Sequence, residues 1–224
     1  MPAKRLQEKN IVTTKKISPD SARPGGKAPK ASARGRPRGF NEDQAVDTAM
    51  ALFHARGYDA VGVAELGEAI GVKAPSLYAA FGSKKGLFER ALARYLEGDG
   101  RFIQGVLDEE GPVAEVLTHL LLRAAEAYGA PGGLPGCLVM DGARNCADPE
   151  VRAVTDAVRQ QGRHRLARRI AREHPDRAEA LADYMVMILA GLSASARDGM
   201  APQALRRTAE IAAAGVRAQL PQGS

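Results

Sequence analysis

Hydrophobic positions recur every three to four residues along most of the chain after residue 40, and this spacing predicts amphipathic helices. The first such segment begins at Asn41, which with Gln44 three positions later is typical of a capping box. Gly57 follows its last apolar position and predicts the end of that helix. No alternating pattern of a β-strand and no internal repeat is found. We therefore expect an all-α fold of about nine helices.

The expected helices are bounded by residues that favour helix ends. Ser83 and Asp148 stand at N-cap positions, and Pro149 occupies the first helical position after Asp148. Alanine, arginine and leucine are abundant, and these residues favour helix over sheet. The nine segments are 41–56, 63–70, 74–80, 84–97 with a continuation over 101–109, 112–128, 137–146, 149–173, 176–197 and 202–219.

Residues 1–39 differ from the rest of the chain in composition and charge. They contain eleven Lys or Arg and two acidic residues, which gives them a charge of +9. Since the whole chain has a net charge of +6, the remaining residues carry −3. They show no apolar period, and we expect them to be a disordered basic arm. A basic arm on a mildly acidic body predicts a polyanionic partner, and a solubilising tail is the alternative.

Other classes of protein are less well supported by the sequence. The N-terminus has no apolar segment typical of a secretory signal, and the longest apolar run, 185–192, is too short to span a bilayer. Two cysteines give no disulfide framework. No catalytic arrangement, metal-ligand spacing or phosphate-binding loop is recognised. We expect a cytoplasmic protein that has no cofactor, no metal and no membrane partner and that is not an enzyme.

Two short helices, 63–70 and 74–80, are joined by a turn at Gly71, which is the arrangement of a helix-turn-helix. The second helix is short enough to lie in the major groove of DNA. Such a turn is common in helical proteins, so the pattern alone does not establish DNA binding.

The residues around this turn are more specific. The segment "ALFHARGYDAVGVAELGEAIGVKAPSLYAAFGSKKGLFERAL", residues 51–92, resembles the TetR family of bacterial transcriptional repressors. The resemblance is strong over about 40–92 and weaker beyond. It implies a homodimer whose subunits have a helix-turn-helix DNA-binding domain, here 40–92, and a helical ligand-binding and dimerisation domain, here 93–220. The implied partners are a palindromic double-stranded operator and a small-molecule effector of unknown identity.

The resemblance also assigns residues to DNA contacts. Tyr78 and Lys84 match positions that usually contact phosphates, and Leu77 and Phe81 match core positions. Gly62 stands where many members have Ser or Thr, so it can cap the second helix but offers no hydroxyl to a phosphate. The recognition-helix positions that face base edges or backbone are Lys73, Ala74, Pro75, Ser76 and Ala79.

The end of the basic arm contains three arginines, Arg34, Arg36 and Arg38, directly before the first helix. A segment in this place lies near the minor groove in homeodomains. "RGRP", residues 34–37, also resembles the core of an AT-hook, in which extended arginines enter A·T-rich minor grooves. We expect the three arginines to contact DNA beside the major-groove helix.

The C-terminal half contains the residues expected to bind the effector, since the family holds its ligand among the middle helices. Ordinary core positions are the alternative for each of them. The candidates are Tyr95, Phe102, Leu117, Leu121, Tyr128, Cys137, Met140 and Met185.

Cys137 can also be a reactive thiol, because a helix start lowers a thiol pKa. Cys146 is nine residues later. In an intact helix it would lie on the opposite face, ~13.5 Å along the axis, so the two would not form a disulfide. A small buried cysteine is the other interpretation of Cys137.

The last two expected helices carry small residues that allow close packing. "LAGLSASA", residues 189–196, and the Ala-rich helix 202–219 predict a four-helix dimer interface, with packing inside one chain as the alternative. Together these observations predict a ligand-responsive transcriptional regulator that acts as a repressor. The alternatives are an architectural protein that binds A·T-rich DNA and a helical small-molecule binder or enzyme with an incidental basic tail.

Overall fold

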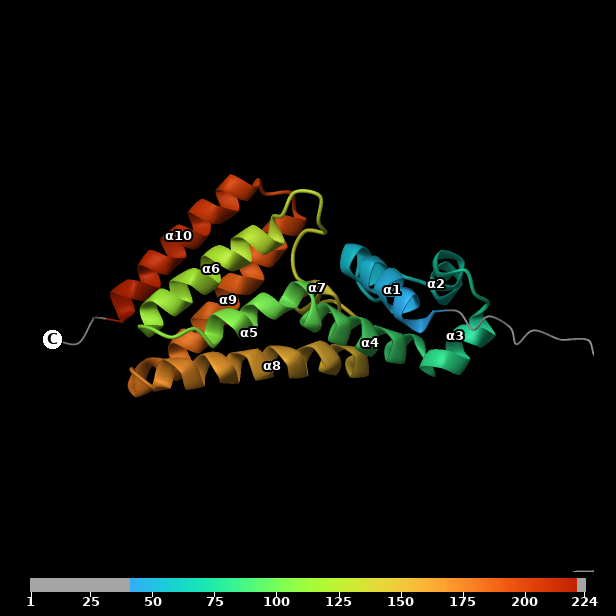
Figure 1. The fold of residues 1–224 in the computed structure, drawn as a ribbon, viewed down its shortest axis with the longest axis horizontal. Coiled ribbons are helices and arrows are strands. Elements are labelled where there is room, and N and C mark those ends of the chain that lie inside the picture. The colour runs from blue at the N-terminus through green and yellow to red at the C-terminus, as the bar shows by residue number, and fades with distance from the viewer. Residues whose placement is uncertain (1–40, 221–224) are drawn as a thin grey trace, which may run out of the picture. The chain divides into compact units, whose positions relative to one another are not determined.

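The computed structural model describes residues 41–220, and within them every regular element is a helix (Figure 1). The prediction of an all-α fold is confirmed. The elements in chain order are α1 (Glu42–Arg56), α2 (Val63–Ile70), α3 (Ala74–Phe81), α4 (Lys84–Glu97), η1 (Asp99–Arg101), α5 (Phe102–Leu107), α6 (Val113–Tyr128), α7 (Leu138–Asp141), α8 (Pro149–Ala171), η2 (Pro175–Arg177), α9 (Ala178–Arg197) and α10 (Pro202–Gln219).

The predicted caps are present where the sequence placed them. The side chain of Asn41 accepts a hydrogen bond from the Gln44 amide at 3.2 Å, and that of Ser83 accepts one from the Gly86 amide at 3.0 Å. Asp148 likewise accepts from the Glu150 amide at 2.8 Å. Each bond satisfies one of the amides that a helix N-terminus leaves without a partner. These local signals therefore locate the helix starts correctly.

Two expected helices differ from the prediction, and the described residues hold ten α-helices instead of nine. Residues 137–146 form only the four-residue α7, since the segment after it bonds to the loop that follows α1 instead of continuing the helix. The Tyr58 amide donates to the Gly142 carbonyl, and the Ala147 amide donates to Asp59. The expected continuation over 101–109 is a separate helix, because Gly98 breaks α4 with a φ of −101° and a ψ of −109°.

One hydrophobic core extends from α1 to α10, and α4 contributes to both ends of it. Near the start of α4, the Phe88 ring packs edge-on against Phe53 of α1, with ring centroids 5.2 Å apart. At its other end Tyr95 is buried beside α7. Figure 1 shows α1, α2 and α3 around the start of α4, whereas α6, α9 and α10 gather beyond its end. α4 therefore joins the helix-turn-helix to the remaining helices.

One helix meets a length and hydropathy criterion for a membrane span, contrary to the expectation from the longest apolar run. Within the described residues, 175–197 forms a 23-residue segment whose apolar window has a mean hydropathy of 1.3. This is weak support for a span, since core helices meet the same criterion and α9 packs against α6, α8 and α10. Its apolar residues are accounted for in part by that packing.

Candidate DNA-binding helices and effector cavity

The turn between α2 and α3 is held in a conformation that depends on glycine. Gly71 is left-handed, with a φ of 79° and a ψ of 29°, and the Val72 amide bonds the Gly67 carbonyl at 2.8 Å. A Cβ on Gly67 would lie 2.7 Å from the Val72 carbonyl oxygen. Leu66 and Leu77 are buried and anchor one helix to the other. The predicted helix-turn-helix is thus formed.

The outward face of α3 presents the residues that the resemblance assigned to DNA. Tyr78 is 47 % exposed, so its ring is not part of the core, whereas Leu77 and Phe81 are buried as expected. Ala74 is half-buried at the start of α3. The remaining assigned residues are all exposed: Lys73, Pro75, Ser76 and Ala79. Their contacts with bases and phosphates stay predictions.

Lys84 and Gly62 lie on either side of α3 along the chain. The Lys84 ammonium lies 4.0 Å from the centroid of the Tyr58 ring, and partial burial lowers the pKa of Lys84. Burial raises the pKa of Tyr58 to about 12. Gly62 is exposed and forms the N-cap of α2 without a side-chain hydrogen bond. Lys84 is therefore packed on an aromatic face, and a phosphate contact there stays a prediction.

The helix-turn-helix segment is not itself basic. Residues 41–92 contain five Lys or Arg and seven Asp or Glu. Arg90 of α4 pairs with Glu42 of α1, and Arg94, two residues beyond this segment, pairs with Asp43. The net positive charge of the chain belongs to 1–39, and Arg34, Arg36 and Arg38 lie outside the described residues.

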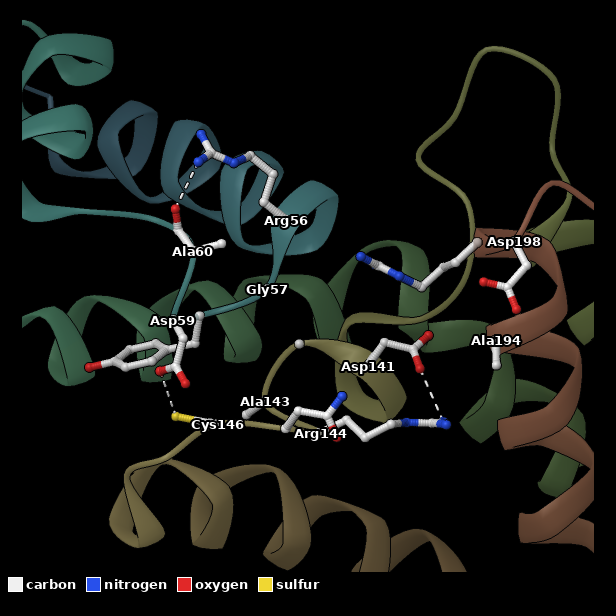
Figure 2. Close-up of a pocket in the computed structure, with 14 residues that line it drawn as sticks. Arg56, Gly57, Asp59, Ala60, Asp141, Ala143, Arg144, Cys146, Ala194 and Asp198 are labelled. Atoms are coloured by element: carbon white, nitrogen blue, oxygen red, sulfur yellow. Dashed lines mark hydrogen bonds and ion pairs between the residues drawn. The ribbon is translucent and has the colours of Figure 1, made fainter.

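A polar pocket of about 470 Å³ lies where the end of α1 meets α7 and α9 (Figure 2). Asp59, in the loop after α1, accepts hydrogen bonds from the Cys146 thiol at 3.0 Å and the Ala147 amide at 2.9 Å. These two bonds lower the pKa of the Asp59 carboxyl, the thiol contributing most. Asp141, which lines the same pocket, pairs with Arg144 at 3.1 Å.

Arg197, at the end of α9, connects the same pocket to the end of α1. Its guanidinium donates to the carbonyl of His54 at 2.6 Å and to that of Ala55 at 3.2 Å. A cation near the last carbonyls of a helix interacts favourably with the helix dipole. Two hydrogen bonds therefore join the end of α9 to the end of α1, the helix that precedes the helix-turn-helix.

The candidate effector residues lie in two groups. Cys137 and Met140 line a small cavity among α4, α5, α7, α8 and α9. Tyr95 and Tyr128 lie against the Cys137 thiol, and Phe102 packs edge-on against Tyr128 with ring centroids 6.2 Å apart. The other three are buried core residues that do not line this cavity: Leu117, Leu121 and Met185.

Of the two interpretations of Cys137, the structure supports the small buried cysteine. Both cysteines are free and buried, and burial raises the pKa of the Cys137 thiol. α7 has only four residues, so its dipole is small, and the desolvation of the thiolate dominates. Nearby, burial lowers the pKa of His54, whose Nε2 has no hydrogen-bond partner among the described residues.

Sequence reasoning missed the contribution of α8 to the cavity. Apart from Cys137 and Met140, none of the candidate residues lines it, and α8 supplies Val158 and Leu166 together with three arginines. α8 is rich in arginine and has a weak apolar period, so the sequence gives little indication of a cavity wall. Two glycines, Gly100 and Gly162, also border it.

A helix-turn-helix with an exposed second helix, joined through one long helix to a helical body with an internal cavity, defines a class of DNA-binding regulators. The family model described as "Bacterial regulatory proteins, tetR family" matches residues 45–91. The chain is 39 % identical to the HTH-type transcriptional repressor BdcR of Escherichia coli (strain K12) over 84 % of this chain and 95 % of the relative. The protein belongs to the TetR family.

Two further relatives agree with this assignment. The HTH-type transcriptional repressor ComR of Escherichia coli (strain K12) is 32 % identical over 79 % of this chain and 89 % of its own length. A solved structure of a cysteine mutant of the TetR family regulator CifR, complexed with 26-bp double-strand operator DNA, is 37 % identical. It covers 80 % of this chain and 98 % of its own, with a TM-score of 0.72.

Replacing Cys137 with serine is expected to leave DNA binding and effector release unchanged, because the thiol is buried and its pKa is raised. A serine hydroxyl can keep a hydrogen bond with the neighbouring tyrosines. Fluorescence anisotropy of labelled DNA, with and without N-ethylmaleimide, measures this. If the reagent dissociates the wild type and not the serine variant, Cys137 is a reactive sensor after all.

Proposed function

We propose that this protein is a ligand-responsive transcriptional repressor, which binds a palindromic operator as a homodimer and leaves it when a small molecule binds. The observation that carries the proposal is the exposed face of α3, which displays Lys73, Ser76 and Tyr78 on a glycine-dependent turn. The printed names of BdcR and ComR as repressors, and the operator complex of CifR, support the same function.

The two expected domains of the chain have different functions in this proposal. Residues 40–92 bind DNA, and 93–220 bind the effector and form the dimer. The cavity borders α4, α5 and α8, so an occupant moves helices that lead to the helix-turn-helix. Arg197 and Asp59 transmit part of that movement through their bonds to the end of α1 and to the segment after α7.

The protein acts in the cytoplasm, where its DNA lies, and it is not an enzyme in this proposal. Its chemistry is the reversible binding of DNA and of an effector. Within residues 41–220, no group of three or more His, Cys, Asp or Glu side chains is placed to hold a metal ion.

The basic arm supplies positive charge that the helix-turn-helix segment lacks. Removing residues 1–38 is expected to weaken DNA binding and to flatten its dependence on salt. Each lost phosphate contact lowers the slope of log affinity against log salt by about 0.9. Preference for the same site remains, because α3 is retained. The measurement is a salt titration on operator and scrambled DNA, and equal slopes for both proteins would mean that the arm does not touch DNA.

In vitro selection from random duplex DNA tests the proposed function against the alternatives. The full-length protein is expected to enrich an inverted repeat, since a two-fold dimer places two copies of α3 on two half-sites. Enrichment of A·T-rich DNA without a repeat would instead indicate an architectural protein that binds through the arm. If no sequence is enriched and no DNA is retained, the protein is a binder or enzyme of another kind.

A further inference from the structure

The cavity that Cys137 and Met140 line is small and mostly apolar. Its volume is about 110 Å³, and its apolar wall includes Leu96, Ile103 and Val186. An apolar cavity of ~150 Å³ in another protein takes up benzene. A body no larger than one ring or a short branched chain therefore fits here, and it would gain its affinity from apolar burial.

One arginine on the wall of this cavity has no side-chain partner among the residues that the structure describes. Three arginines of α8 line it, and two of them are already bound: Arg159 by Asp156 and the Val139 carbonyl, and Arg163 by Asp183 and Glu179. Arg165 is exposed, and its side chain makes no hydrogen bond or ion pair among residues 41–220. An unpaired guanidinium beside an apolar space is a binding group for a carboxylate or phosphate.

A second hollow, of about 370 Å³, adjoins the first and extends this positive charge. The two share Gln104, Leu107 and Arg165. The hollow also contains two more arginines of α8, the arginine that follows α8, and one acid: Arg168, Arg169, Arg172 and Asp108.

The arginines of the second hollow are poorly compensated. Arg169 is only 7 % exposed and is held by Glu173 and the Gly111 carbonyl, yet its Nε is buried without a partner. Arg168 and Arg172 are exposed and unpaired within the described part of the chain. Like charges one turn apart on a helix destabilise it. A bound anion would offset that repulsion.

We propose that the effector is a compact organic anion whose apolar body, one ring or a short branched chain, fills the cavity while its carboxylate or phosphate binds Arg165. This inference rests on the proposed function, since it names the chemical class of the effector of that function. The ligand joins α5 to α8 and lies against the end of α4. Its anionic group faces the hollow that Arg168 and Arg172 keep positive.

Calorimetry on the full-length protein tests the inference with probes that share one ring. Benzoate and phenyl phosphate carry the anion, benzamide and benzyl alcohol are neutral, and benzylamine is a cation. We expect the anionic probes to bind at least about tenfold more tightly than the others, because a charge-assisted hydrogen bond is lost without the anion. The tighter of the two anions identifies the head group.

Two pairs of variants locate the site. Arg165→Gln should weaken the anionic probes at least about tenfold, whereas Arg123→Gln, an exposed and unpaired arginine of α6, should not. Gly162 borders the cavity, and a Cβ on it would meet nothing within 4 Å. Gly162→Leu should therefore fill the cavity without disturbing α8, since leucine favours a helix. Gly162→Ala is the smaller control. We expect binding to be lost only with leucine.

Release of the selected DNA site by the same probes, at constant ionic strength, links binding to function. The anionic probes should release the DNA from the wild type and not from Arg165→Gln. The inference is overturned if no probe binds, if neutral or cationic probes bind as well as benzoate, or if Arg165→Gln binds benzoate unchanged. If calorimetry shows the expected preference but the protein selects no DNA site, the proposed function fails and the anion site stands.

Discussion

Replacing Gly86 with alanine is expected to lower the affinity for operator DNA by about tenfold or more. A Cβ at this position would lie 2.2 Å from the carbonyl oxygen of Phe81, the last residue of α3. The clash is relieved only if α3 moves away from the start of α4, and overpacking of this kind costs about 1–3 kcal/mol. The exposed face of α3 then no longer matches the groove.

Fluorescence anisotropy on the selected site measures this loss, and circular dichroism shows whether the helices remain. Gly105→Ala is the matched control, because a Cβ on this α5 glycine meets nothing within 4 Å. That variant is expected to bind DNA as the wild type does and to gain a little stability, since alanine favours a helix interior by about 1 kcal/mol. Wild-type affinity for Gly86→Ala would show that DNA binding does not depend on how α3 is seated on α4.

Introducing a charge on the exposed apolar face of α9 and α10 is expected to dissociate the dimer. Met187 is 64 % exposed and Ile211 is 75 % exposed within one chain, so both side chains are free to pack against a partner subunit. Met187→Glu would bury an unpaired carboxylate in the interface. A monomer engages one half-site, so operator affinity should fall by about 100-fold or more.

A second substitution tests the same interface by volume. A Cβ on Gly191 meets nothing within 4 Å in its own chain, so Gly191→Leu affects packing only if a partner lies there. Size-exclusion chromatography with light scattering gives the mass of each variant. Leu134→Glu, at an exposed apolar residue in the loop before α7, is the control and should remain a dimer. Intact dimers of both α9 variants would place the interface on another face.

The helices and their ends were predictable because their determinants are local. Asn41, Ser83 and Asp148 cap helices through side chains that bond amides two or three residues away. The helix expected over 137–146 is longer than the observed α7 for the opposite reason. The residues after α7 bond to Tyr58 and Asp59, which are more than eighty residues away along the chain. No local sequence signal predicts bonds between such distant residues.

The candidate site was predictable where the family motif is specific and less so elsewhere. The exposed positions of α3 follow from the motif, and their exposure agrees with that assignment. The cavity depends on which faces of distant helices meet. The sequence of α8 is rich in arginine, and this composition is typical of a solvent-exposed helix. Only the fold brings Arg165 beside Leu107 of α5. The sequence left both a reactive and a buried Cys137 open, because burial, which raises the pKa of this thiol, is a tertiary property.

The affinity for a whole operator, compared with that for one half-site, tests the central claim most directly. The measurement is an anisotropy titration, at fixed salt, of the selected inverted repeat, of the same duplex with one half scrambled, and of a fully scrambled duplex. A dimeric repressor is expected to bind the full repeat at least about 1,000-fold more tightly than scrambled DNA. The half-site should bind far more weakly than the full repeat. Equal affinity for all three duplexes would contradict a sequence-specific dimeric repressor.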